Sequence, residues 1–250
     1  MNNKTSRLIS FWGILFIPIV WVFCKDVLNI PDRYLPSILQ VISAFKDIEP
    51  NVFVHFFVTL SRLLVGMVLG ILVGVFLGIL LYYSSRLNDF LSPFIQSIRS
   101  IPAIATVPFF ILWFGFSEFG KYFLVTLGIS LNIAISSYQI LSKMPEKYSV
   151  FSKGFQIKLN KKIRHYSLPT VLEHIYPTIR FSLSTAIGLV IVSELLGSQI
   201  GLGYLIQTSR STFSIHVIFL AVILLGIMNF TLDLTIKYLW KKIIFWQKRQ

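Results

Sequence analysis

Charged side chains, among them Arg180, Glu194 and Asp233, interrupt long apolar stretches in the second half of this 250-residue sequence. If those stretches cross a bilayer, each charge costs about 2.5–3.5 kcal/mol on insertion scales, which makes each residue a functional candidate. Arg180 and Glu194 are fourteen residues apart, so they lie about 21 Å apart along a helix and cannot pair. We expect Arg180 to extend to the inner membrane surface and Asp233 to contact Lys237 or an inner loop. Glu194 is either functional or solvated near the outer end.

Motifs that carry enzyme chemistry are missing from the sequence. It contains no H-E-x-x-H zinc motif, no aspartate-rich diphosphate motif, no G-x-S-x-G nucleophile motif and no G-x-x-x-x-G-K-[ST] phosphate loop. The single cysteine, Cys24, can form neither an internal disulfide nor a metal site by itself. We therefore predict a protein that is not an enzyme, has no catalytic or metal-ligating residues and binds no cofactor.

A repeated glycine pattern indicates a helix that packs closely against another. Gly66, Gly70, Gly74 and Gly78 recur every four residues within an apolar stretch. This G-x-x-x-G spacing leaves a face without side chains, which a second helix can approach. The pattern does not show whether that helix belongs to the same chain or to a second copy.

The composition places these helices in a membrane, because 55% of the residues are hydrophobic and only 13% are charged. Pro93, Pro102 and Pro108 fall in the third long apolar stretch, which we expect to be kinked or split. Six stretches have about the length needed to span a bilayer: residues 8–27, 55–83, 90–116, 119–140, 175–196 and 215–239. The sequence predicts an all-α polytopic membrane protein with about six transmembrane helices.

The distribution of basic residues predicts the orientation. With the amino terminus inside, 15 of the 23 lysines and arginines fall in inner segments and five in outer ones. This asymmetry predicts that both termini are cytoplasmic. It also accounts for the net charge of +13 without a nucleic-acid partner.

The longest inner segment, residues 141–177, is strongly basic. Connections of this length tend to be functional when they are ordered. Its central part, residues 148–166, is compatible with one or two short amphipathic helices. It is either a docking surface for a cytoplasmic subunit or a loop held by anionic headgroups.

Several short motifs occur in a fixed order over residues 35–240: Leu35–Ser37, His55–Arg62, Ser92-Pro93, Ser100–Ala103, Ile111–Gly115, Leu168-Pro169, Ser193–Leu196 and Gly201–Ile206. In these motifs the chain resembles permeases of binding-protein-dependent ABC importers, particularly the nitrate/sulfonate/taurine branch. The most specific of them are Trp113-Phe114-Gly115 and Gly201–Ile206.

One departure from that family lies in the inner loop. The family usually has Glu-Ala-Ala, three residues, a glycine, and Leu-Pro about eleven residues later. Counting back from Leu168-Pro169 without gaps places Val150-Phe151-Ser152 at the Glu-Ala-Ala positions and Gln156 at the glycine. Gly154 fits only with an insertion of two residues, whereas Pro145 stands where the family has its preceding proline.

The resemblance implies a type I ABC importer-like permease in the bacterial inner membrane. Such a permease pairs with a second copy, docks an ABC ATPase that uses ATP and magnesium, and receives solute from a periplasmic or lipid-anchored binding protein. The solute stays open among nitrate, sulfonates, taurine and vitamin precursors. The implied coupling-loop residues are Pro145, Val150, Phe151, Ser152, Gly154, Gln156, Leu168 and Pro169, and the candidates for the translocation path are Glu194, Gly201, Gly203 and Tyr204.

The predicted organisation follows the chain as a cytoplasmic N-terminus (1–7), a first transmembrane helix (8–27), a periplasmic loop (28–54), a permease core (55–240) with its coupling loop (141–174), and a basic cytoplasmic tail (241–250). Two other interpretations stay open. An ion-coupled transporter or channel would use Glu194 or Asp233, and an accessory paralogue would lack an ATPase partner. Transport that follows an ion gradient rather than ATP would favour the first.

Overall fold

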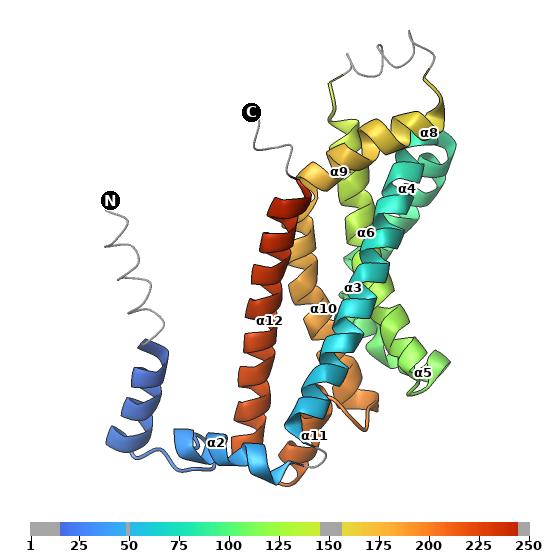
Figure 1. Cartoon of the computed structure of the whole chain (residues 1–250). Coiled ribbons are helices and arrows are strands. Elements are labelled where there is room, and N and C mark those ends of the chain that lie inside the picture. Colours follow the sequence, from blue (N-terminus) through green and yellow to red (C-terminus); the bar gives the residue numbers. More distant parts are fainter. Residues whose placement is uncertain (1–15, 49–50, 146–156, 245–250) are drawn as a thin grey trace, which may run out of the picture.

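A computed structural model describes residues 16–48, 51–145 and 157–244, and the described part of the chain is helical throughout (Figure 1). Residues 16–22 form a helix that runs into a π-helical turn at Phe23–Val27. The following helices are α2 (Ile38–Asp47), α3 (Val52–Tyr83), α4 (Ser85–Ser100), α5 (Val107–Phe114), α6 (Glu118–Ser142), α8 (Leu159–Lys162), α9 (Leu168–His174), α10 (Tyr176–Gly197), α11 (Leu202–Ser211) and α12 (Ile215–Ile243).

Four of these helices, α3, α6, α10 and α12, are long and apolar enough to cross a membrane. Their ends lie within four residues of the second, fourth, fifth and sixth predicted stretches. This agreement is expected, since a bilayer forces an apolar segment to satisfy its backbone hydrogen bonds internally as a helix. The first predicted stretch, 8–27, lies partly outside the described residues.

The third predicted stretch is split, as its prolines suggested. Helix α4 and the segment Ala103–Phe114 together are long and apolar enough to span, but they meet at a 90° bend. Pro102 stands at the break, immediately before a 3-10 turn (Ala103–Thr106), and Pro108 lies in the first turn of α5. The first turn of a helix tolerates proline, because an N–H at that position has no intrahelical acceptor.

Helices α3 and α6 pack along the glycine stripe. A methyl group added at Gly66 would lie 2.5 Å from Val125 Cγ1, and one at Gly74 would lie 2.6 Å from both Ile133 Cβ and the Ser130 carbonyl oxygen. Added methyl groups at Gly70 and Gly78 would likewise collide with α6. The helix that the stripe admits therefore belongs to the same chain.

The two ends of the bundle carry different short helices (Figure 1). Helix α2 packs against α12 at one end, where α11 also lies, while α8 and α9 cross the opposite end. Helix α2 begins with a capping box, in which Ser37 and Gln40 each accept a backbone N–H of the other. The 90° bend between α4 and α5 lies between these two ends.

Candidate functional site

A buried ion pair ties the end of the bundle that carries α11. Arg62 of α3 donates from Nη1 to Oε1 of Glu194 of α10 at 2.7 Å, and the two side chains are 4% and 0% exposed. The same Nη1 donates to the Ile200 carbonyl at 2.7 Å. Of the two alternatives for Glu194, solvation near the outer end is therefore wrong, because α3 and α11 cover the side chain.

Both oxygens of the Glu194 carboxylate have further donors. The Thr59 hydroxyl lies 2.9 and 3.0 Å from them, and the Gly203 backbone N–H donates at 2.9 Å. Thr59 Oγ1 in turn accepts the Leu202 N–H at 2.9 Å. A buried carboxylate needs such donors, because burying a charge without hydrogen-bond donors costs more free energy than its ion pair contributes.

The glycines of the Gly201–Ile206 motif make room for this carboxylate. Gly201 has φ +137°, and a methyl group at this residue would collide with the Glu194 carboxylate. A methyl group at Gly203 would lie 2.7 Å from Glu194 Cβ. The backbone N–H of Gly201 donates to Nδ1 of the buried His55 at 3.0 Å, which fixes the start of α11 against α3.

The network continues to α6 at the same end. Arg62 donates from Nε and Nη2 to the two Glu118 oxygens at 2.7 and 2.5 Å, and Lys121 donates to Glu118 at 2.9 Å. The two positive charges of Arg62 and Lys121 balance the two negative charges of Glu118 and Glu194. The arrangement therefore joins α3, α6, α10 and α11 without leaving a net charge at the site.

A cavity of about 600 Å³ opens beside this network, lined among others by Arg62, Glu118, Lys121, Tyr204 and Gln207. Of the predicted path residues, only Tyr204 lines it. Glu194, Gly201 and Gly203 are buried in the network. The structure thus brings all four predicted path residues together, and three of them hold helices in place.

The opposite end carries the described part of the predicted coupling loop. Pro145, Leu168 and Pro169 lie there, with Pro169 in the first turn of α9, whereas Val150, Phe151, Ser152, Gly154 and Gln156 lie outside the described residues. A groove of about 510 Å³ separates the end of α6 from α9, with Lys143, Pro145, His165, Pro169 and Glu173 among its lining residues. Helix α9 contacts both α6 and α10.

The partner of Asp233 differs from the predicted one. Arg180 of α10 donates from Nε and Nη2 to both Asp233 oxygens of α12, at 2.5 and 2.6 Å. Asp233 therefore pairs with Arg180 and not with Lys237. The rotation of α12 against α10 decides this pairing, and a single-helix pattern does not contain that rotation.

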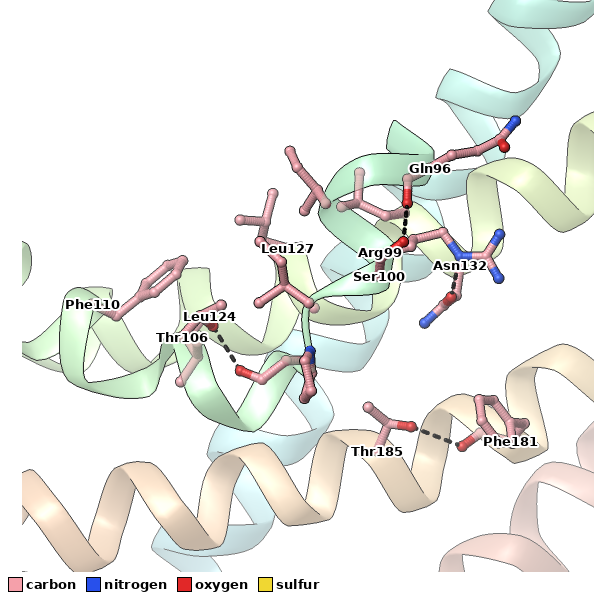
Figure 2. Close-up of a pocket in the computed structure, with 16 residues that line it drawn as sticks. Gln96, Arg99, Ser100, Thr106, Phe110, Leu124, Leu127, Asn132, Phe181 and Thr185 are labelled. Atoms are coloured by element: carbon pink, nitrogen blue, oxygen red, sulfur yellow. Dashed lines mark hydrogen bonds between the residues drawn. The ribbon is translucent and has the colours of Figure 1, made fainter. Parts of the chain in front are cut away.

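A third cavity of about 590 Å³ lies at the bend of the broken span, between α4, α5, α6 and α10 (Figure 2). Arg99, from the last turn of α4, lines it and donates from Nε to Oδ1 of Asn132 of α6 at 2.9 Å. Phe110, Phe181 and Thr185 also line it. Arg99 lies within the third predicted stretch, and the break at Pro102 is the sequence signal for this site.

No group of three histidine, cysteine, aspartate or glutamate side chains gathers to hold a metal within the described ranges. The geometry is that of a helical membrane protein with three parts. The charge-balanced network of Arg62, Glu118, Lys121 and Glu194, called the clamp below, lies at one end. The broken span lies in the middle, and the transverse helix α9 lies at the other end.

The sequence matches the family described as the binding-protein-dependent transport system inner membrane component over residues 66–245. The chain belongs to this family. The resemblance seen in the short motifs is thereby confirmed: the chain is a multi-pass inner membrane permease of a binding-protein-dependent ABC transporter. It is therefore the membrane component of a transport system.

Two relatives and one solved structure show the extent of the similarity. The permease is 30% identical to the aliphatic sulfonates transport permease SsuC of Bacillus subtilis, over 91% of this chain and 83% of the relative. It is 26% identical to the formylaminopyrimidine transport permease ThiX of Halalkalibacterium halodurans, over 94% of each chain. Its fold resembles a chain of the inward-facing MetNI methionine ABC transporter, with a TM-score of 0.60, 21% identity, and coverage of 76% of this chain and 98% of that one.

Proposed function

We propose that this permease carries a small solute of the sulfonate or pyrimidine type into the cell, powered by an ABC ATPase docked at α8 and α9. The relatives named for sulfonate and formylaminopyrimidine transport support this range of solutes. The observation that carries the proposal is the transverse helix α9, which contacts α6 and α10. Both of those helices line the cavity at the bend of the broken span, which is called the central cavity below.

The contacts of α9 suggest how ATP would drive transport. An ATPase that pushes on α8 and α9 would move the inner ends of α6 and α10 together. These two helices carry Leu127, Asn132, Phe181 and Thr185 in the cavity wall. Such a movement would open the cavity alternately to the two sides, with the ATPase favouring one state by its differential binding.

The proposed orientation places α8 and α9 in the cytoplasm, together with both termini. Lys158, Lys161, Lys162 and Arg164 cluster in and beside α8, as the positive-inside rule requires of a cytoplasmic segment. The clamp around Glu194 would then face the periplasm, where a periplasmic or lipid-anchored binding protein would deliver solute. The permease would act as a homodimer, and because α6 already occupies the glycine stripe, the second copy would bind elsewhere.

Co-purification tests the ATPase partnership. The tagged permease would be isolated from its native host in mild detergent, and its partners would be identified by mass spectrometry. We expect an ABC ATPase to co-purify, and charge reversal at the inner face (K161E/K162E/R164E) to release it. The matched control is R210E on α11, which reverses a charge at the other end and should leave the ATPase bound.

Intact wild-type permease without any ATPase would contradict the proposal and favour the accessory paralogue. Within the described ranges, the structure offers no observation that favours the ion-coupled alternative. Its two candidate carboxylates, Glu194 and Asp233, are each already neutralised by an arginine.

A further inference from the structure

The central cavity has the dimensions and lining of a small-molecule site. Its volume of about 590 Å³ falls within the range of about 300–1,000 Å³ that is typical of ligand pockets. Phe110, Leu127 and Phe181 provide apolar wall, while Asn132 and Thr185 add polar groups (Figure 2). Among the described residues that line it, Arg99 is the only charged one.

Arg99 differs from the other two arginines of the spans. Arg62 is paired with Glu118 and Glu194, and Arg180 with Asp233. Arg99 is exposed at the cavity, its Nε donates to the neutral amide of Asn132, and no carboxylate among the residues that the structure describes pairs with it. A cation within a membrane span is costly unless water or an anion compensates it.

The position of Arg99 places its charge beside the cavity at the break. The residue lies in the last turn of α4, about 21 Å along the axis from Ser85 at 1.5 Å per residue. The helix breaks two residues later, at Ile101-Pro102. The cation thus sits beside the opening in the broken span, and a solute crossing through this cavity would pass it.

We propose that Arg99, oriented by Asn132, is an oxyanion-binding subsite in the translocation path, and that the solute is therefore a small organic anion such as an alkyl sulfonate. The bond from Nε to Asn132 fixes the guanidinium plane and leaves the two Nη groups to donate to two oxygens of one acidic group. The apolar part of the solute packs on Phe110, Leu127 and Phe181. The inference rests on the proposed function for its transport role, and it selects the sulfonate type over the neutral pyrimidine.

Cysteine modification tests the subsite directly, because the chain has one cysteine to remove. In a C24S background, T185C places a single thiol in the cavity wall. Its reaction rates would be measured in membranes with two methanethiosulfonates, the anionic 2-sulfonatoethyl reagent and the cationic 2-trimethylammonioethyl reagent. The anionic reagent is itself an alkyl sulfonate.

We expect R99Q to lower the anionic-to-cationic rate ratio at T185C about tenfold, as a charge interaction of about 1.4 kcal/mol would give. R99K should keep part of the preference, because it retains the charge without the planar fork. Excess ethanesulfonate should slow the modification of T185C when Arg99 is present and not in R99Q. The matched control is Q207C in the cavity beside the Arg62 network. There R99Q should leave the anionic-to-cationic rate ratio unchanged.

An unchanged ratio in folded R99Q, or a T185C thiol that reacts with neither reagent, would overturn the subsite. Folding of each variant would be checked by gel filtration, and R99K provides a second variant if R99Q does not fold. The assay requires no ATPase. Charge selectivity at T185C without a co-purifying ATPase would therefore refute the proposed function alone.

Discussion

At the scale of single residues, the permease pairs its buried Glu194 with partners from other helices. Glu194 is fully buried, and its carboxylate receives hydrogen bonds from Arg62, Thr59 and the Gly203 backbone. Glu118 binds the same arginine but keeps 50% of its side chain exposed. The same ion-pair chemistry thus occurs in two environments, which should give two different contributions to stability.

Glu194→Gln should lower the stability of the permease by up to about 3–5 kcal/mol, because it removes the buried carboxylate that pairs with Arg62. Glu118→Gln should cost about 1 kcal/mol or less, because water screens an exposed pair. The loss of monodisperse protein on heating, followed by size-exclusion chromatography in detergent, would compare the two. Equal midpoints for both variants would show that the Arg62–Glu194 pair is not a structural clamp.

At the scale of helices, the glycine stripe of α3 sets the distance to α6. A methyl group added at Gly74 meets the Ser130 carbonyl and Ile133 Cβ, neither of which can rotate away. Gly226 of α12 offers the contrast, since a methyl group there meets nothing within 4 Å. Both glycines lie within long membrane helices, so a substitution changes helix propensity in both and packing in only one.

Gly74→Val should separate α3 from α6 and destabilise the permease by about 1–3 kcal/mol, the usual range for overpacking. Gly226→Val should leave the midpoint of heat-induced aggregation close to that of the wild type. Yields of monodisperse protein after membrane extraction would provide a second measurement. If Gly226→Val is as damaging as Gly74→Val, backbone effects and not helix contact explain the stripe.

At the scale of the whole molecule, the basic end at α8 and the charge-balanced end at α11 support the proposed orientation. The cluster in and beside α8 carries four cations within seven residues, whereas the network around Arg62 balances two cations with two carboxylates. Because cytoplasmic loops retain lysine and arginine, the proposed topology makes opposite predictions for reporters at the two ends.

A green fluorescent protein fused after Gln250 should fluoresce, and an alkaline phosphatase at that position should be inactive, because the phosphatase folds only outside the cytoplasm. The phosphatase should be active when it is inserted at Phe213, in the turn between α11 and α12. Activities would be normalised to the amount of fusion protein on immunoblots. An active phosphatase after Gln250 would invert the proposed topology and move the ATPase site away from α8 and α9.

The sequence alone was sufficient to predict four of the membrane helices, the split third stretch and the family, whereas the first of the six predicted stretches stays a prediction. Apolar length determines a transmembrane helix almost by itself, since a bilayer offers the backbone no other hydrogen-bond partners. The glycine spacing likewise predicted a packing face on α3. These features are local, so a window of about 20 residues contains them.

Only the tertiary structure decided which charges meet. Arg62 reaches Glu194 across 132 residues, Arg180 reaches Asp233 across 53, and Arg99 reaches Asn132 across 33. Such pairs depend on how each helix is rotated and which helix lies beside it, and a single apolar pattern does not contain that information. The clamp at Glu194 and the lone cation at the broken span therefore became visible only when the helices were packed together.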